Sequence, residues 1–517
     1  MTIAVDWLDK RAKLSPDKVA LIDTIGDRKL TYKEWDENVN RTAHFMREQL
    51  GIQKGDRVAV LATNCVEYLD VLFACNKLGS ILQNLNWRLA VPELEQLIRD
   101  AKPKTLIYSA EFLDQVNKLK VREDIPCVRN FVALEEKAGP IDISFFIRDR
   151  FPAHKPDTPS VSLDHPWVIC YTGGTTGLPK GAIQTHGNIT WNAINTVMSW
   201  GVGAEDTAIL NAPLFHTGGL NVFTAPLVQA GGTSIVCKTF DVDQVFDLVE
   251  TGDVSVFFGV PTMFTMMQNH ERWETADFSK LKVVISGGAP CPMPVFERFW
   301  AKGVDFKTGY GLTEAGPNTF WLPPEQVREK PGFVGYPLFH VACKLVDEQG
   351  VRITTPDVAG ELCIRGPHRT PGYWNNPEAT AEAIDEDGWL HTGDLAIADA
   401  DGAYKIVGRA KDMYISGGEN VYPAEVESIM HSHPAVSEAA LFGIPDDKWG
   451  EVGCAVIALK RDQNLDEATM IQFLKDRVAH YKVPRHVRFV EELPKTGAGK
   501  ISKKVLKERY GKIDEAS

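Results

Sequence analysis

The chain has 517 residues, of which 44% are apolar, and it carries a formal net charge of −13. That length and apolar content suffice for a large core and for more than one domain. The acidic balance argues against a nucleic-acid-binding protein, because affinity for a phosphate backbone depends on clustered Lys and Arg. We therefore expect no nucleic-acid partner.

The N-terminal segment becomes charged too early for a secretory signal, and no apolar stretch approaches the length of a membrane-spanning helix. The nine cysteines are scattered and never form a Cys-x-x-Cys pair. This pattern is typical of free thiols in a reducing compartment. We predict no transmembrane segment and a cytoplasmic location.

Short apolar runs alternate with helical patterns from the start of the chain. The segment 57–63 is expected to be a buried strand, and 91–101 a helix with Leu94, Leu97 and Ile98 on one face. Further buried strands are predicted at 104–110, 254–261 and 281–288. Unalternating strands separated by helices are typical of parallel sheets covered on both faces, so we predict an α/β fold.

Two composition changes divide the chain. The first is a proline-rich, polar connector at 139–166; the second is a hairpin at 395–412 with an Asp-Gly turn. A strand at 435–444 and an amphipathic helix at 467–482 are expected beyond the hairpin. We predict two domains, a large one over 1–408 and a small, mobile α+β domain over 409–517.

The segment 171–186, YTGGTTGLPKGAIQTH, contains four glycines, four threonines and Lys180. Glycines let backbone N–H groups crowd an anion, threonines offer hydroxyl donors, and lysine adds a positive charge. Pro179 precedes Lys180, so the spacing differs from that of the common phosphate loop, in which glycine precedes lysine. The segment predicts a phosphate-binding loop; the alternative is a glycine-rich surface loop without a ligand.

The segment 281–290, LKVVISGGAP, places small residues directly after a predicted strand. Gly287, Gly288 and Ala289 leave room for a flat ring to lie against the backbone. Ligands commonly bind at this edge of a parallel sheet. A plain strand-to-helix turn is the alternative.

The segment 309–317, GYGLTEAGP, offers three kinds of side chain to a nucleotide. Tyr310 has an aromatic face, Thr313 a hydroxyl, and Glu314 a carboxylate that is able to hold Mg²⁺ beside phosphate oxygens. The alternative is a solvated turn.

Later segments add one acidic and one basic candidate. Asp394, in GWLHTGDLA (388–396), is suited to accept both hydroxyls of a ribose. Lys500 lies in the glycine-flanked segment PKTGAGKIS (494–502). Taken alone, Asp394 is as typical of a turn or a cap, and Lys500 of an exposed lysine.

These segments, together with GRAKDMYISGGENVYPAEVE (408–427), follow one another over about 330 residues. In this order they closely resemble the signature motifs of the AMP-dependent acyl-CoA synthetases, part of the adenylate-forming superfamily. The resemblance extends over essentially the whole chain. It implies an enzyme that joins a small carboxylic acid to AMP with loss of pyrophosphate and then transfers the acyl group to coenzyme A. The implied ligands are ATP, Mg²⁺, coenzyme A and the acid.

The resemblance implies a role for each nucleotide-site residue. Thr313 would contact the α-phosphate, Glu314 would hold Mg²⁺, and Lys500 would bridge the acyl carboxylate and the α-phosphate. The other implied contacts are Thr172, Gly173, Gly174, Thr175, Thr176, Gly177 and Lys180 with phosphates; Gly288, Ala289 and Tyr310 with adenine; and Asp394 and Arg409 with the ribose. The family usually has serine in place of Gly173, so backbone N–H groups must bind more of the phosphate here.

The resemblance also implies a moving domain. In this family the small domain rotates about a residue two positions after the arginine, and Lys411 holds that place. After rotation Gly418 would line the channel for the pantetheine arm, where any β-carbon would narrow the passage.

The acid site is the least defined part of the sequence. His216, in PLFHTGGLNVF (213–223), holds the family's position beside the carboxylate; the alternative is a packed core histidine. Other expected wall positions are Gly218, Gly219, Leu220, Val260, Pro261, Gly316 and Pro317. Their apolar character argues against a charged acyl tail. We expect a medium- or long-chain fatty acid, with an aryl or cinnamate-type acid as the alternative.

Two other functions stay open at this point. One is an adenylation enzyme whose acceptor is a carrier protein; no carrier domain follows Lys500, which favours free coenzyme A. The other is a nucleotide- or acyl-binding sensor, although a pure binder has no use for a lysine that acts only in chemistry. A homodimer is one option for the oligomeric state.

Overall fold

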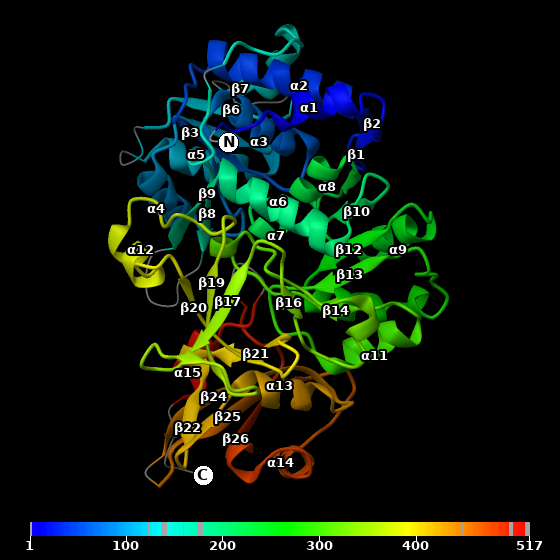
Figure 1. The fold of residues 1–517 in the computed structure, drawn as a ribbon, viewed down its shortest axis with the longest axis vertical. Coiled ribbons are helices and arrows are strands. Elements are labelled where there is room, and N and C mark those ends of the chain that lie inside the picture. Colours follow the sequence, from blue (N-terminus) through cyan, green and yellow to red (C-terminus); the bar gives the residue numbers. More distant parts are fainter. Residues whose placement is uncertain are drawn as a thin grey trace.

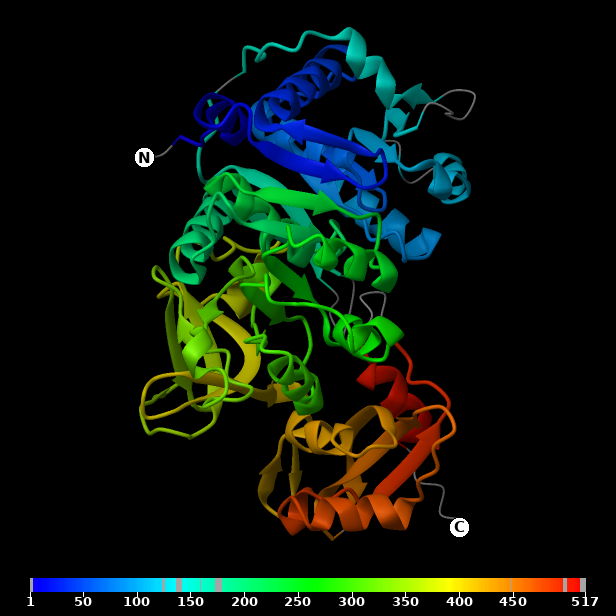
Figure 2. The same cartoon turned by 90° about the vertical axis from the view of Figure 1, so that its right-hand side faces the viewer.

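The computed structural model describes residues 3–122, 125, 127–135, 142–158, 160–172, 179–446, 448–495 and 500–511. The chain forms a long molecule with a large lobe and a smaller C-terminal lobe (Figures 1 and 2). The smaller lobe, coloured orange and red, lies at the bottom of both views. Among the described residues, no helix is long and apolar enough to cross a membrane.

Two seven-stranded sheets build most of the large lobe. The first has the order β14-β13-β12-β10-β11-β1-β2, and the second the order β7-β6-β5-β3-β4-β8-β9. The strands of the first are β1 (Val19–Asp23), β2 (Arg28–Thr31), β10 (Thr207–Leu210), β11 (Thr233–Val236), β12 (Val256–Gly259), β13 (Val283–Ser286) and β14 (Lys307–Thr308). Those of the second are β3 (Arg57–Leu61), β4 (Ile81–Asn84), β5 (Thr105–Tyr108), β6 (Asn130–Ala133), β7 (Ile143–Ser144), β8 (Pro166–Thr172) and β9 (Lys180–Thr185).

Pairing within both sheets is parallel except at the edge pairs β1–β2 and β8–β9. Short connections at those two places permit antiparallel pairing, whereas parallel neighbours need a longer crossover. The predicted strands at 57–63, 104–110, 254–261 and 281–288 are confirmed as β3, β5, β12 and β13. The predicted α/β fold is therefore confirmed.

Helices connect and cover these sheets (Figure 1). The large-lobe helices are α1 (Trp7–Leu14), α2 (Tyr32–His44), α3 (Val66–Leu78), α4 (Val91–Ala101), α5 (Leu113–Lys120), α6 (His186–Trp200), α7 (Thr217–Asn221), α8 (Thr224–Ala230), α9 (Val242–Glu250), α10 (Pro261–Gln268), α11 (Met293–Ala301) and α12 (Pro377–Ala383). The predicted helix at 91–101 is confirmed as α4, in which Leu94, Leu97 and Ile98 are buried.

A third, antiparallel sheet leads toward the C-terminal lobe. Its order is β18-β17-β19-β20-β21, with β17 (Ala342–Val346), β18 (Arg352–Ile353), β19 (Gly360–Arg365), β20 (Leu390–Ala398) and β21 (Tyr404–Arg409). The β20–β21 hairpin is the one predicted at 395–412. A short pair, β15 (Phe320–Trp321) and β16 (Tyr336–Pro337), lies before this sheet in the chain.

The C-terminal lobe is a separate sheet packed with helices. Its strands are β22 (Tyr414–Ser416), β23 (Glu419–Val421), β24 (Val436–Asp446), β25 (Gly450–Leu459) and β26 (His486–Val490), and its helices α13 (Pro423–His431), α14 (Glu467–Lys475) and α15 (Lys503–Tyr510). The helix predicted over 467–482 is too long, because α14 ends at Lys475. Beyond α14 the chain forms a 3₁₀ turn, His480–Lys482, and an extended Val483 before it enters β26. The proposed domain boundary at 408/409 coincides with the end of β21.

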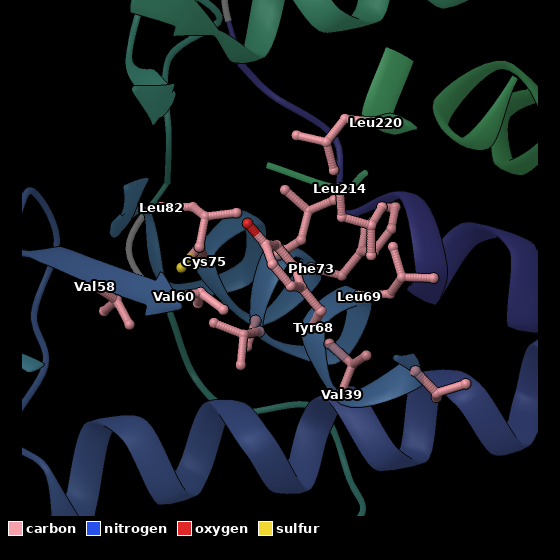
Figure 3. Close-up of a cluster of buried hydrophobic side chains, with 14 of the residues drawn as sticks. Val39, Val58, Val60, Tyr68, Leu69, Phe73, Cys75, Leu82, Leu214 and Leu220 are labelled. Atoms are coloured by element: carbon pink, nitrogen blue, oxygen red, sulfur yellow. The ribbon is translucent and has the colours of Figure 1, made fainter. Parts of the chain in front are cut away.

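The largest hydrophobic cluster joins the two parallel sheets. It combines side chains of β3 and β4 with those of α2 and α3 and with Leu214 and Leu220 beside or on α7 (Figure 3). Leu220 is 2% exposed and Leu214 1%. The segment that carries His216 is thus anchored on both sides in the main core. All nine cysteines are free thiols, as expected.

Candidate active site

The predicted phosphate loop connects two antiparallel strands. Thr172 ends β8 and lies opposite Lys180, the first residue of β9. The Thr172 hydroxyl lies 3.3 Å from the Lys180 carbonyl oxygen and 3.4 Å from Glu314 Oε1. The hairpin therefore brings Thr172, the last residue before the loop, close to Glu314. The other predicted loop residues lie outside the described residues: Gly173, Gly174, Thr175, Thr176 and Gly177.

Glu314 lies in a short 3₁₀ turn, Thr313–Ala315, and is 8% exposed. Its Oε1 accepts a hydrogen bond from the Tyr373 hydroxyl at 2.9 Å. Burial raises the pKa of Tyr373, and Glu314 adds to the effect, so the hydroxyl stays protonated and donates. The Lys180 ammonium lies 5.3 Å from the centre of the Tyr373 ring. Carboxylate and hydroxyl oxygens next to a phosphate loop are the donors that Mg²⁺ prefers.

The predicted adenine platform lies where β13 ends. Gly288 has a φ of 81° and is exposed, and Ala289 is half-buried. A β-carbon on Gly287 would come within 3.0 Å of the Phe258 ring. Tyr310 follows β14, the neighbour of β13, so these residues share one sheet edge. The exposed Gly288 carries no β-carbon, so its backbone surface is open to a flat ring.

Asp394 is the most tightly held of the predicted residues. It is 4% exposed; its Oδ2 accepts from the Tyr310 hydroxyl at 2.5 Å, and its Oδ1 pairs with Arg409 Nε at 2.6 Å. Asp394 and Arg409 are cross-strand partners in β20–β21. Burial raises the pKa of Asp394, and Arg409 opposes that shift. Each carboxylate oxygen keeps a second lone pair with which to accept a ribose hydroxyl.

A side chain that the sequence analysis missed holds the turn before Asp394. Glu361 Oε1 accepts the N–H of Gly393 at 2.9 Å, and its Oε2 pairs with His391 Nδ1 at 2.9 Å. Gly393 has a φ of 66°. The ligating atoms of Glu361, Cys363 and His391 lie within 4.8 Å of one another. Burial raises the pKa of the metal-free Cys363 thiol to about 12, and the hydrogen bonds of Glu361 account for its role in holding the turn.

Lys500 reaches the nucleotide site from the C-terminal lobe. It is exposed, yet surrounding protein atoms partly desolvate its ammonium and lower its pKa; Arg409 lowers it further. Asp394 and Glu314 act in the opposite direction. The ammonium therefore lies within electrostatic reach of both carboxylates.

Of the other two small-domain candidates, Lys411 lies within electrostatic reach of Asp394 and Arg409, and Gly418 lies in a separate turn. Lys411 is exposed in the 3₁₀ turn Ala410–Asp412, between the hairpin and β22. Partial burial lowers its pKa, and Arg409 adds to this effect. Gly418 is in the β22–β23 turn with a φ of 88°, and a β-carbon there would meet no described atom within 4 Å. Among the described residues, Gly418 therefore faces open space.

His216 precedes α7 and packs against Phe215, with ring centres 4.6 Å apart. Its Nε2 is buried and has no hydrogen-bond partner among the described atoms. Burial lowers the pKa of His216 to about 4, with Lys500 and Arg88 contributing, so the ring is neutral at pH 7. The unpaired Nε2 is available for a ligand contact, but it does not by itself distinguish His216 from the buried His368, whose two ring nitrogens are also unpaired among the described atoms.

The expected acid wall is close-packed. A β-carbon on Gly219 would lie 2.4 Å from the Pro213 carbonyl oxygen, and one on Gly218 would lie 3.2 Å from Phe258. Gly316 is equally restricted, because its β-carbon would lie 2.9 Å from Asn192. Leu220 is in the core, Val260 and Pro261 begin α10, and Pro317 follows Gly316. No larger residue fits at these glycines without rearrangement.

Comparison with known proteins agrees with this geometry. Residues 8–374 match the AMP-binding enzyme family, and residues 425–500 match the AMP-binding enzyme C-terminal domain.

Curated relatives match along their whole length. A feruloyl-CoA synthase from Amycolatopsis sp is 40% identical, with 98% of each chain covered. An indoleacetate–CoA ligase from Aromatoleum aromaticum is 35% identical over 96% of each, and the long-chain-fatty-acid–CoA ligase FadD13 of Mycobacterium tuberculosis is 34% identical over 98% of each.

The solved structure of ATP-bound MatB from Rhodopseudomonas palustris matches with a TM-score of 0.88 at 31% identity, covering 99% of both chains. The chain therefore belongs to the AMP-binding enzyme family and is an AMP-forming acid–CoA ligase that uses ATP, Mg²⁺ and coenzyme A.

Proposed function

We propose that the acid is an aryl acid, such as a hydroxycinnamate or an arylacetate, rather than a medium- or long-chain fatty acid. The acid carboxylate attacks the α-phosphorus of ATP and pyrophosphate leaves. The coenzyme A thiolate then attacks the acyl carbonyl and AMP leaves with the former carboxylate oxygen. Like charges meet in the first step, so fixed cations and donors are expected to supply most of the catalysis.

The site geometry supports a division of work among the chain's own groups. Lys500 offsets the repulsion between carboxylate and α-phosphate, and His216 contacts the carboxylate end of the acid. Asp394, Arg409 and Tyr310 bind the nucleoside. Glu314 would hold Mg²⁺, which when bound would neutralise charge on the phosphates. Thr172, Lys180 and Thr313 contact the phosphates directly.

One aromatic ring carries the choice of acid. Phe258 lies between the expected acid wall and the expected adenine platform, because β-carbons on Gly218 and Gly287 would lie 3.2 and 3.0 Å from its Cε1 and Cε2 atoms. Behind it, Trp200 stacks on Trp321 with ring centres 5.3 Å apart. A flexible alkyl chain would have to displace this packed aromatic cluster, whereas a flat ring can end against it.

The relatives support the same choice. Feruloyl-CoA synthase and indoleacetate–CoA ligase, whose names state aryl acids, are 40% and 35% identical to this chain, and a fatty-acid ligase is 34% identical. The fatty-acid expectation is unconfirmed, and the aryl alternative fits better.

A panel of acids tests the proposal. Purified protein, ATP, Mg²⁺ and coenzyme A should form thioester from ferulate and indole-3-acetate with a kcat/KM at least about tenfold above that for decanoate or palmitate, the discrimination expected of pocket shape. A preference for decanoate or palmitate would overturn the aryl proposal and leave the ligase class intact.

The variant Phe258→Ala tests the wall itself. It should raise the ratio of decanoate to ferulate activity about tenfold, since the removed ring opens space for an alkyl chain. Phe131→Ala, a half-buried phenylalanine of β6, is the matched control and should leave the ratio unchanged. An unchanged ratio in Phe258→Ala would remove the ring from the acid site.

A further inference from the structure

A buried polar cluster lies beneath the two halves of the site. We propose that Gln184 of β9 is a positioning residue that couples the acid wall at α7 to the nucleotide turn at Thr313. This inference rests on the site assignments proposed above. Gln184 itself touches neither substrate, because it is 2% exposed and surrounded by protein groups.

Gln184 uses one amide group to hold both sides. Its Nε2 donates to Thr217 Oγ1 at 3.0 Å and to the carbonyl oxygen of Thr313 at 3.3 Å. Its Oε1 accepts from Asn221 Nδ2 at 3.0 Å, and the same Asn221 nitrogen lies 3.1 Å from Thr217 Oγ1. Thr217 and Asn221 are the first and last residues of α7. Both ends of the acid-wall helix are therefore tied to the amide.

The cluster also extends to the far side of the nucleotide turn. Asn192 of α6 donates to the Asn221 carbonyl oxygen at 2.8 Å, and its Oδ1 accepts the N–H of Asn318 at 2.9 Å. Asn318 in turn donates to Thr196 at 2.8 Å. The segment from Thr313 to Asn318 is thus fixed near both ends by groups that also fix α7.

The shared amide makes the two subsites interdependent. Thr217 directly follows His216, and the Thr313 carbonyl belongs to the peptide that orients Glu314. Leaving a buried donor or acceptor unpaired is costly, so a shift of α7 on acid binding must be followed by the Thr313 carbonyl. Acid binding is thereby transmitted to the phosphate- and metal-binding turn, a coupling that is reciprocal by thermodynamic necessity.

Calorimetry on the intact enzyme measures this coupling. The dissociation constant of α,β-methylene-ATP, a non-cleavable analogue, is determined with Mg²⁺ in the absence and in the presence of whichever acid the wild type converts best. The ratio of the two constants reports the coupling. The ratio is taken as the constant without acid divided by the constant with acid. Gln184→Met keeps the side-chain length but makes no hydrogen bonds. In this variant the ratio should fall at least about fivefold, because bound acid no longer strengthens nucleotide binding.

Two further variants separate coupling from plain stability. Gln268→Met removes another buried glutamine, 5% exposed, whose Nε2 donates from α10 to the Val295 carbonyl oxygen of α11, and it should leave the ratio unchanged. Thr217→Val removes the tie at the first residue of α7 and keeps the tie through Asn221, so it should lower the ratio in the same direction but less than Gln184→Met does. It keeps the test open if Gln184→Met is unstable.

A merely structural Gln184 would weaken both dissociation constants equally and leave the ratio at the wild-type value. That result, in either Gln184→Met or Thr217→Val, overturns the inference. It does not affect the proposed aryl substrate, because the acid is chosen by measured activity.

Discussion

The two lobes contribute to the site in opposite ways. The large lobe supplies groups that are buried and held by several partners: Asp394 contacts both Tyr310 and Arg409, and Glu314 contacts Tyr373. The small lobe supplies Lys500, Lys411 and Gly418, which are exposed. Side chains that must keep one position through both half-reactions are best held in a rigid core. Side chains that act in only one half-reaction can lie on a domain that moves away afterwards. The proposed domain rotation would account for this difference.

Removing the small lobe's cation should give the largest effect. Lys500→Ala deletes the charge that offsets carboxylate–phosphate repulsion, and loss of one such contact commonly costs about 3–4 kcal/mol, so pyrophosphate release should slow by about two to three orders of magnitude. Supplied with ready-made acyl-adenylate and coenzyme A, the same variant should form thioester at a near-normal rate. Equal slowing of both half-reactions would contradict the rotation.

Obstructing the thiol's expected path should have the converse effect. Gly418→Leu should leave pyrophosphate release near normal and slow thioester formation about a hundredfold, the cost of misplacing a reacting group by about 1 Å. Gly402→Leu is a matched control, because Gly402 has a similar φ of 83° and equally open surroundings. If both variants behave alike, backbone strain and not the channel explains the result.

The buried histidines of the large lobe should give a smaller, pH-dependent effect. Burial lowers the pKa of His368 to about 4, below its unfolded value of about 6.5. Below pH 6.5 the unfolded chain therefore binds a proton that the folded chain does not, and stability falls as pH drops toward 4.

For one such group the slope of unfolding free energy is at most about 1.4 kcal/mol per pH unit. His368→Asn should remove that part of the slope in denaturant titrations between pH 6.5 and 4.5. His433→Asn, at a half-buried small-lobe histidine, should change the slope less. A wild-type slope retained in His368→Asn would mean that this histidine is protonated in the folded protein.

Local features of the sequence predicted most of the architecture. Apolar runs and glycines identified the parallel strands, and the bounds of α4 follow from its stripe of Leu94, Leu97 and Ile98. The end of α14 was missed because pairing of β26 with β25, a tertiary contact, decides where the chain becomes extended.

The supporting residues of the site could not be predicted. Tyr373 is 59 positions from Glu314, and Gln184 is 129 positions from Thr313, so neither pairing leaves a local pattern. Glutamine in an apolar strand is more typical of a surface-facing position, and only the fold places it under the site. The roles of the motif residues and the 408/409 boundary stay predictions.

The cross-strand pair of Asp394 and Arg409 bears on how the intermediate survives. Arg409 ends β21, two residues before the proposed pivot at Lys411, so a rotation about Lys411 leaves it in place. An acyl-adenylate is readily hydrolysed once it escapes to water. The large lobe does not move in the proposed rotation, so its contacts with the ribose would hold the acyl-adenylate in the site. The intermediate would stay bound while Lys500 moves away and the coenzyme A thiol enters. The expected outcome is little wasteful ATP turnover when coenzyme A is scarce.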